Sequence, residues 1–334
     1  MVESFIVMLQ TNSEIKPPVG VIESLTGGFE TTASRLPAVF FPLAFDLFLW
    51  LGPRLSINPL IQQLIALVNS APAQDAASDQ NRQAIVEMWR IMGEKTNLFT
   101  LFSTWPVGVP SLMAAELPTL IPNGKPLILS LDNGLLMFFF VLTFSLIGLL
   151  LGAIYYNVLA SPLRDQPLTL NDMIVRSIIN WAKIVVFVLL VILMGGIISL
   201  PFLLVIGLLQ LISTGLAAIG VSIWGAVAMW LWIYIAFTLH GMVLRDRSVW
   251  GAMWDSMRIV QFNLFPVMGL YILTFVLNWG LGYLWSLPAE DSWLTLAAIG
   301  GHAFVSTALI AATFVFYKDR YRWWVEVKSQ KAKR

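Results

Sequence analysis

Long apolar stretches alternate with short polar connections through most of this chain. A helix needs about 20 mostly apolar residues to cross a bilayer. The segments that reach this length are Leu36–Ile57, Gly134–Ala160, Ile178–Leu200, Gly220–Leu244, Val260–Ser286 and Leu294–Tyr317. The alternation therefore predicts an all-α, polytopic membrane protein whose six transmembrane helices form three hairpins.

The apolar run that begins at Ile178 is longer than one simple span requires. Gly195, Gly196 and Pro201 interrupt it, and a proline inside a helix cannot donate a backbone hydrogen bond. We expect Pro201–Thr214 to form a kinked extension of the third span or a half-inserted turn. A seventh span is the alternative.

The basic residues fall in every second connection, and this spacing predicts the orientation of the chain. Connections rich in Lys and Arg remain in the cytoplasm. The connections 206–217 and 287–293 contain no basic residue, whereas the alternate ones do. We therefore expect a multi-pass protein of the cell (inner or plasma) membrane with both termini in the cytoplasm. Arg54 is the exception. The basic residues expected at the cytoplasmic surface are Arg164, Arg176, Arg245, Arg247, Arg258, Lys318, Arg320 and Arg322.

This orientation divides the chain into five parts. Residues 1–35 are expected to form a cytoplasmic segment with an interfacial helix, and residues 36–57 the first span. Residues 58–133 form an insertion outside the cell, and residues 134–317 form a region of five transmembrane helices. Residues 318–334 form a basic cytoplasmic tail.

The insertion is predicted to be helical. Pro59–Val68 and Asn81–Gly93 have helical apolar spacing on either side of a polar linker. Leu98–Leu117 is apolar but contains Pro106 and Pro110. This combination suits an interfacial or shallow re-entrant segment, because irregular backbone cannot face lipid. The insertion would serve either as a lid or docking surface, or as a helical cap on the bundle.

The composition supports a membrane location and excludes several classes of function. Of the 334 residues 58% are hydrophobic and 12% charged, and the mean hydropathy is +0.78, whereas soluble domains are roughly 45–50% apolar and about 25% charged. The chain contains no cysteine, so disulfides, thiolate nucleophiles and cysteine metal sites are excluded. A net charge of +1 argues against nucleic acid as a partner.

A weak internal repeat precedes two of the spans. The segment SLTGGFETTASRLPAVFFP at 24–42 aligns without gaps on SVWGAMWDSMRIVQFNLFP at 248–266, with Ser, Gly, Phe and Pro in common. Each copy is a short amphipathic stretch that leads into a span, and Thr169–Lys183 has the same character. Such helices lie in the membrane interface. We therefore predict three units, each a cytoplasmic-side interfacial helix followed by a transmembrane hairpin. A chance similarity of amphipathic helices is the alternative.

The Ser/Gly-led helix, the basic residue and the Phe-Pro pair before a span, repeated over six helices, resemble several poorly characterised bacterial inner-membrane families. The nearest is the membrane domain attached to some glycerophosphodiester phosphodiesterases, together with its stand-alone relatives. The resemblance covers residues 22–57 and 160–320 and implies a bacterial polytopic membrane protein. The chain lacks a soluble phosphodiesterase domain, and no catalytic residue carries over.

Three ionisable side chains are expected at bilayer depth, where burying such a group is costly and often marks a site. Asp46, in the first span, is a proton or cation site, a counter-charge for a cationic ligand, or a structural carboxylate. His240, near the inner end of the fourth span, and His302, near the outer end of the sixth, are site residues or hydrogen-bonded packing residues. Since the two histidines lie at opposite depths, we expect no metal site between them.

Other intramembrane residues are expected to hold the helices together. Gly148–Gly152 and Ala297–Gly301 place small residues four positions apart, which permits close packing, and we expect that packing within one chain rather than between copies. Asparagine and glutamine side chains in the spans are expected to form hydrogen bonds between helices. They are Asn157, Asn180, Gln210 and Asn278.

Motifs of known catalytic sites are absent from the sequence, which contains no H-E-x-x-H, G-x-S-x-G, Walker A or G-x-G-x-x-G pattern. No cofactor, metal or catalytic residue is therefore expected. The preferred hypothesis is a non-enzymatic protein that organises or assists membrane components, with anionic lipid at its basic face and a membrane-protein partner. A small-solute transporter or channel with Asp46 in the pathway is the alternative, and a lipid-acting membrane enzyme is the second. A polar cavity reaching Asp46 would favour transport, and a filled bundle would favour the scaffold.

Overall fold

The chain folds into a bundle of helices with almost no sheet. The computed structural model describes residues 17–70, 76–103, 107–122, 124–166 and 168–333. Within these residues five helices are long and apolar enough to cross a membrane, and the number rises to six if a bent pair of shorter helices counts as one span. The predicted class, an all-α multi-pass membrane protein, is confirmed.

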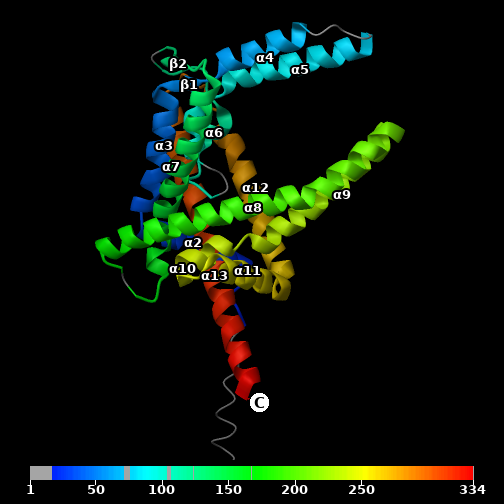
Figure 1. The fold of residues 1–334 in the computed structure, drawn as a ribbon. Coiled ribbons are helices and arrows are strands. Elements are labelled where there is room, and N and C mark those ends of the chain that lie inside the picture. Colours follow the sequence, from blue (N-terminus) through cyan, green and yellow to red (C-terminus); the bar gives the residue numbers. More distant parts are fainter. Residues whose placement is uncertain (1–16, 71–75, 104–106, 123, 167, 334) are drawn as a thin grey trace, which may run out of the picture.

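Three of the predicted spans correspond to single helices (Figure 1). α7 covers Gly134–Ala160, as predicted, and Asn133 caps its first turn with the side-chain oxygen. α12 covers Leu264–Trp285. α13, Thr295–Lys333, begins where the sixth span was expected but continues well beyond its predicted end. The basic residues that follow Tyr317 therefore lie on the same helix as the span.

The first predicted span corresponds to α3, Pro37–Leu51, and the helix expected before it corresponds to α2, Val21–Ser34. The two helices meet at an angle of 82°. The prediction that this span continues to Ile57 is wrong, because Pro53 disfavours helix at the residue before it and strand β1, Arg54–Ser56, follows. The 15 residues of α3 extend only about 22 Å at 1.5 Å per residue, which is shorter than the ~30 Å hydrocarbon core of a bilayer.

Helix α8 is continuous over 43 residues, Leu170–Ile212. The prediction of a separate interfacial helix before the third span is therefore wrong. A capping box between Thr169 and Asp172 begins the helix, and no glycine or proline interrupts it before Gly195. The amphipathic stretch consequently continues into the apolar one. The helix also passes through Pro201, so the residues after it extend the span and form neither a half-inserted turn nor a seventh span.

The fourth predicted span is divided into two helices. α9 covers Thr214–Ile235, and α10 covers Thr238–Arg245. At the break the hydroxyl of Ser256, on α11 (Val249–Phe262), accepts a hydrogen bond from one backbone N–H and donates to one backbone carbonyl, those of Phe237 and Tyr234. These bonds pair backbone groups that a helix break leaves without partners, which is essential in an apolar environment.

Both copies of the internal repeat form a short helix followed by a longer one: α2 precedes α3, and α11 precedes α12. The aligned serines nevertheless differ in role. Ser248 accepts a hydrogen bond from the N–H of Gly251 as the cap of α11, whereas Ser24 lies inside α2 and donates to the carbonyl of Gly20. Because α8 supplies no third copy, the described chain has two such units rather than the three expected.

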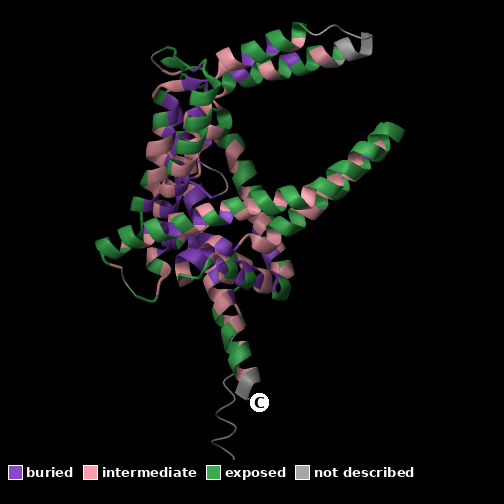
Figure 2. Cartoon of the chain, viewed as in Figure 1, coloured by how far each residue is buried: buried purple, intermediate pink, exposed green. Residues whose placement is uncertain are grey.

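Two helical hairpins project from the bundle (Figure 1). One consists of α4 (Asn58–Ser70) and α5 (Ala76–Lys95), and the other of α8 and α9. Figure 2 shows that both are largely exposed, whereas buried residues concentrate where α10, α11 and α13 meet. The tip of the α8–α9 hairpin is apolar and open, with Leu211 84% and Ile212 74% exposed. Apolar side chains exposed on helices of this length are expected to contact lipid.

The remainder of the insertion folds back among the helices. A 3-10 helix, η1 (Leu98–Phe102), leads inward, and a short helix, α6 (Leu112–Glu116), leads outward again. Strand β2 (Ile128–Ser130) then pairs in parallel with β1. Before α6 the backbone of Val107 and Gly108 lies against α7, where the Tyr156 hydroxyl donates to the carbonyl of Gly108 at 3.3 Å. The described parts of this segment contact α3, α7 and α13. We refer to residues 98–117 as the re-entrant segment, and their position relative to the membrane stays a prediction.

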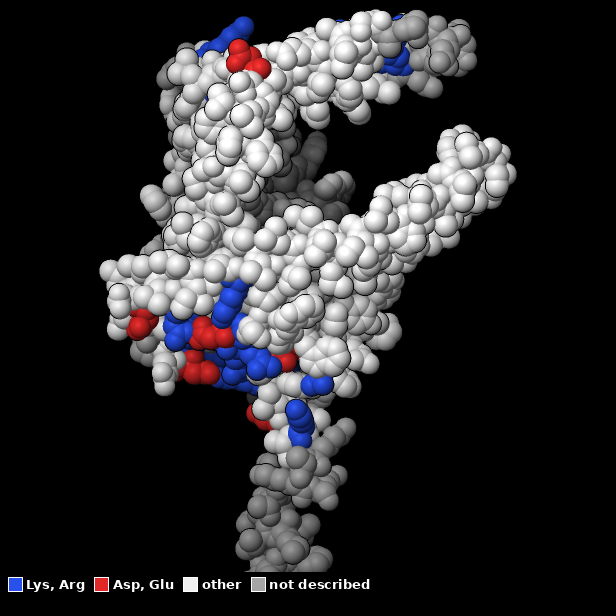
Figure 3. Space-filling view, in the orientation of Figure 1, with Lys and Arg blue, Asp and Glu red and all other residues white. Residues whose placement is uncertain are grey.

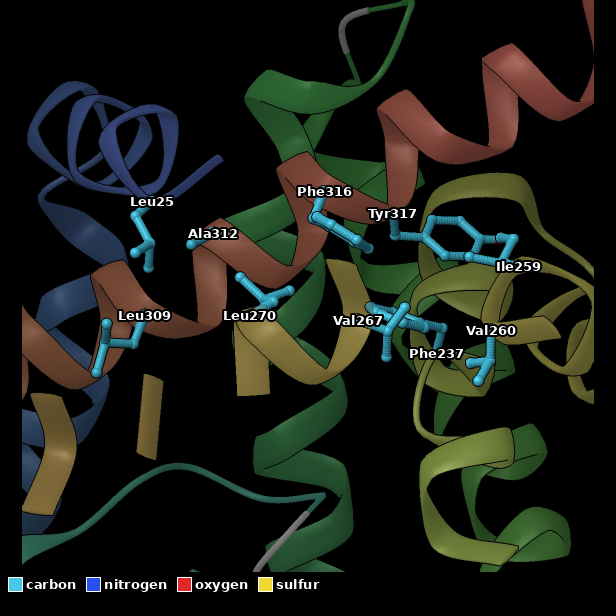
Figure 4. Packing of buried hydrophobic residues seen from close by; sticks show 10 residues of the cluster. All are labelled: Leu25, Phe237, Ile259, Val260, Val267, Leu270, Leu309, Ala312, Phe316 and Tyr317. Carbon is cyan, nitrogen blue, oxygen red and sulfur yellow. The ribbon is translucent and has the colours of Figure 1, made fainter. Parts of the chain in front are cut away.

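Charged side chains gather at the two ends of the bundle and leave an uncharged band between them on the visible face (Figure 3). Within the bundle the largest apolar cluster joins α2, α11, α12 and α13 (Figure 4). Its buried members are Leu25, Phe237, Ile259, Val260, Val267, Leu270, Leu309, Ala312, Phe316 and Tyr317. These side chains fill the space between the helices in this part of the bundle.

Candidate functional site

Asp46 is fully buried and fixed by three hydrogen bonds. It lies on α3 and accepts a bond from the hydroxyl of Ser111 at 2.5 Å. It also accepts bonds from the backbone N–H groups of Leu112 and Met113, both at 3.1 Å. The carboxylate thereby pairs donors at the start of α6 that would otherwise be unsatisfied. This geometry is that of a carboxylate that ties the re-entrant segment to the first span.

The structure brings His302 beside Asp46. Nδ1 of His302, on α13, lies 3.6 Å from Oδ2 of Asp46. Nδ1 is buried and has no hydrogen-bond partner, so the carboxylate is the acceptor it faces. With a proton on Nδ1 alone, the ring directs an N–H at the carboxylate and leaves Nε2 on the other side of the ring as an acceptor.

A cleft of about 1290 Å³ lies beside this pair, between α12, α13, α7 and the re-entrant segment. His302 and Ser111, both neighbours of Asp46, line it, but the Asp46 side chain itself does not. α12 packs on the bundle through Val267 and Leu270, which are buried, whereas its second half is exposed. The cleft therefore lies between that second half and α13. Its volume exceeds the 300–1,000 Å³ typical of sites for drug-sized ligands.

The walls of the cleft combine aromatic rings with uncharged polar groups. Hydroxyl and amide side chains come from η1, α12 and α13, and a carboxylate, Glu116, comes from the end of α6. Neither Lys nor Arg is among the lining residues. The polar lining side chains are Thr100, Ser103, Ser111, Glu116, Thr274, Asn278, Ser286, His302, Ser306 and Thr313, and the aromatic ones are Tyr156, Tyr271, Phe275, Trp279 and Tyr283.

His240 lies apart from the Asp46–His302 pair. Nε2 of His240 is 2.7 Å from the hydroxyl of Thr313, and the ring packs against Phe314 at 4.3 Å between centroids. Thr313 follows His302 on α13 by three helical turns, about 16 Å. The described residues contain no group of three or more side chains that could hold a metal ion. His240 is thus a packed, hydrogen-bonded residue whose partner Thr313 lines the cleft.

The connection between α12 and α13 is fastened to the insertion by Glu290. Its carboxylate accepts bonds from both the backbone N–H and the hydroxyl of Thr119 and from the backbone N–H of Leu120. Partial burial by itself raises the pKa of Glu290, but these bonds and the charge of Arg54 together lower it below the usual value. Arg54, the basic residue that did not fit the predicted orientation, therefore has an acidic partner at its own end of the bundle.

The other end of the bundle carries an ionic network. Asp246, which ends α10, pairs with both Arg164, at 3.6 Å, and Arg176. Asp165 pairs with Lys318 and Arg322 on α13, and these two cations lower the pKa of its carboxyl. The network joins the connection after α7, the end of α10 and the extension of α13.

Replacing Asp246 by asparagine should lower the free energy of unfolding by about 1–2 kcal/mol. The Arg164 side chain is only 6% exposed and would lose its nearest carboxylate. Asp246→Ala should cost more, because residue 246 has a left-handed backbone (φ 53°) that asparagine tolerates better than alanine. Thermal unfolding in detergent measures both, with Asp291→Asn in the opposite connection as the control. An Asp246→Asn variant as stable as the native chain would contradict the prediction.

The basic residues expected to meet lipid headgroups have different surroundings. Arg245 lies over the ring of Tyr321, at 4.5 Å, and Arg258 lies over Trp254 and Trp324. The others have acidic or apolar neighbours: Arg247 pairs with Asp255, Lys318 and Arg322 pair with Asp165, and Arg320, which is buried, lies over Phe316. Arg245 and Arg258, held beside aromatic rings at this end, are the best placed to reach headgroups.

Comparisons with protein-family models, curated proteins and solved structures found no match to this chain. The function of the protein must therefore be inferred from the geometry of the cleft and its surroundings.

Sequence reasoning singled out Asp46 and His302 separately and missed their contact and the role of Ser111. A signal for Ser111 was present, since a serine that follows a proline and precedes an apolar run is a typical helix cap, and Ser111 caps α6. Asn278 was expected to bridge helices, but it is exposed and lines the cleft.

Proposed function

We propose that this protein is a non-enzymatic integral membrane protein that holds an amphipathic membrane component in the cleft, and so organises or assists such components. The observation that carries the proposal is the cleft between the second half of α12 and α13, with its aromatic and polar walls. A lipid-like molecule suits these walls, because its chains can contact the rings while its polar part meets the hydroxyl and amide groups.

The closed floor of the cleft favours binding over conduction. Leu309 lines the cleft and also belongs to the large apolar cluster of Figure 4, together with Leu270 and Phe316. The filled cluster therefore bounds the cleft at Leu309. The carboxylate of Asp46 is in addition engaged by three donors. Both features support a site open at one end over a transporter or channel that uses Asp46.

The hydroxyl groups near His302 support a non-enzymatic role. Ser306 donates to the backbone carbonyl of His302, and Ser111 donates to Asp46. A nucleophilic hydroxyl that the imidazole activates would donate its hydrogen bond to the imidazole. Neither of these two hydroxyls does so. Neither Ser306 nor Ser111 is therefore placed as the nucleophile that a lipid-acting enzyme of the serine type would need beside the Asp46–His302 pair.

A cytoplasmic location of both termini is part of the proposal. Its support is the ionic network and the aromatic–basic pairs of Arg245 and Arg258 at the end where α13 emerges, since cytoplasmic surfaces are rich in basic residues and attract anionic lipid. The absence of cysteine makes the test direct. In intact cells, a membrane-impermeant thiol reagent should label Asp291→Cys and not Ser329→Cys. The reverse labelling would invert the orientation.

Filling the cleft tests the proposed function. Thr274, on α12, lines it, so Thr274→Phe should place a ring where the ligand would lie. Lipid retained by the purified protein, counted by native mass spectrometry, should fall at least about threefold. Ser222, on the exposed face of α9, provides the matched control, and Ser222→Phe should retain lipid as the native chain does. Equal lipid retention by both variants would sink the proposal.

A further inference from the structure

The cleft contains polar groups at one depth. Asn278 lies seven residues before the end of α12, and His302 lies seven residues after the start of α13. At 1.5 Å per residue both lie about 10 Å inside the helix ends. Asp46, behind His302, is five residues from the end of α3. A ligand in the cleft can therefore meet Asn278 and His302 in one layer, while the other polar lining groups lie at other depths.

Asn278 needs a partner that the described chain does not provide. Its side chain is exposed on a span helix and lines the cleft, and within the described residues it makes no hydrogen bond. An amide in an apolar environment is costly unless it is hydrogen-bonded. A ligand in the cleft is in a position to supply that partner.

The charge of this layer restricts what those contents can be. His302 presents Nε2 as an acceptor, because Nδ1 faces Asp46 at 3.6 Å. Glu116, at the outer mouth, is also an acceptor, and no Lys or Arg lines the cleft. Cationic side chains, above all arginine, are the strongest donors to a phosphate or carboxylate held out of water. A site with acceptors and no cation instead complements a head group that donates hydrogen bonds.

We infer that the cleft selects amphipathic molecules whose head group donates hydrogen bonds and carries no net negative charge. This inference rests on the proposed function and names the class of ligand. The shared chemistry is an O–H or N–H donor directed at Nε2 of His302 and at the carbonyl oxygen of Asn278. A hydroxyl-bearing neutral lipid and an amine-bearing zwitterionic lipid both supply it. Asp46 acts as a positioning residue, because it orients His302 and does not line the cleft.

The experiment uses the full chain in nanodiscs that contain equal amounts of diacylglycerol, phosphatidylethanolamine and phosphatidylglycerol. Lipid released from the protein is counted by native mass spectrometry, and the lipid that Thr274→Phe still retains is subtracted as bound outside the cleft. Diacylglycerol or phosphatidylethanolamine should exceed phosphatidylglycerol at least about fivefold, the factor for one hydrogen bond of ~1 kcal/mol. The two arms distinguish a hydroxyl from an amine as the donor.

Two variants test the residues assigned to the layer. Asn278→Leu changes an exposed side chain and should fold normally, and it should reduce the preference about fivefold while total lipid is unchanged. His302→Leu should do the same, and His302→Gln, which restores an acceptor, should recover part of the preference. Equal retention of the three lipids by the native chain would overturn the inference and leave the proposed function intact. No difference between native protein and Thr274→Phe in any lipid would overturn both.

Discussion

Replacing Asp46 by alanine should lower the free energy of unfolding by about 3–5 kcal/mol, one of the two largest effects expected in this protein. The carboxylate is fully buried and accepts bonds from Ser111, Leu112 and Met113. Alanine would leave these donors without an acceptor, and each buried, unsatisfied polar group costs about 1–3 kcal/mol. The re-entrant segment would lose its attachment to α3, and the cleft wall at Ser111 would move.

Graded variants separate this structural role from a role in a solute pathway. Asp46→Asn should have an intermediate effect, because its oxygen can still accept while its NH₂ group opposes one of the donors. Ser111→Ala should cost about 1–2 kcal/mol, since it removes one of the three bonds to the carboxylate and also the side-chain cap of α6. Unfolding in detergent measures all of these, with Asp291→Asn as a surface control. Native stability of Asp46→Asn would show that the carboxylate does not anchor the segment and would return it to consideration as an ion site.

Replacing Gly152 by alanine is the second change expected to have a large effect. A Cβ at this position would lie 2.5 Å from the carbonyl oxygen of Val107 and 2.9 Å from the Cα of Gly108. Both atoms belong to the backbone, so no side-chain rotation relieves the overlap. The re-entrant segment must move away from α7, and we expect a cost of about 2–3 kcal/mol together with loss of the Tyr156–Gly108 hydrogen bond.

Gly195 provides a control with the opposite expected sign. It also lies inside a span helix, but no atom lies within 4 Å of the position its Cβ would take. Because alanine is favoured over glycine in a helix by about 1 kcal/mol, Gly195→Ala should be neutral or slightly stabilising. The difference between the two variants in unfolding temperature measures the packing against α7. If Gly152→Ala were as stable as Gly195→Ala, the close approach of the re-entrant segment would be disproved.

The same glycine shows how far a local pattern can be interpreted. Gly148–Gly152 correctly predicted a close approach within the chain, but the partner is an irregular segment from the insertion instead of a second helix. Ala297–Gly301 behaves as expected, since the ring of Trp285 on α12 lies where a Cβ of Gly301 would be. Spacing along one helix indicates that something packs closely, whereas the identity of the partner depends on the rest of the fold.

The sequence by itself determined the properties that depend on contiguous residues. An apolar run of 20 or more residues must be helical in a bilayer because its backbone has no other hydrogen-bond partners, and α7 accordingly has the predicted bounds. The predicted first span was too long, because the effect of Pro53 in ending a helix was given too little weight. The separate interfacial helix before the third span was predicted where no glycine or proline ends the amphipathic stretch.

Only the tertiary structure decided how the polar groups combine. Asp46, Ser111 and His302 are separated by 65 and more residues, and nothing in their local sequences indicates that they meet. They come together because the re-entrant segment enters between α3, α7 and α13 and brings backbone donors that only a buried carboxylate can satisfy. The cleft likewise arises because α12 packs on the bundle through only half of its length. Hydrophobic pattern fixes which segments leave water, whereas hydrogen-bond satisfaction among distant segments fixes where a site forms.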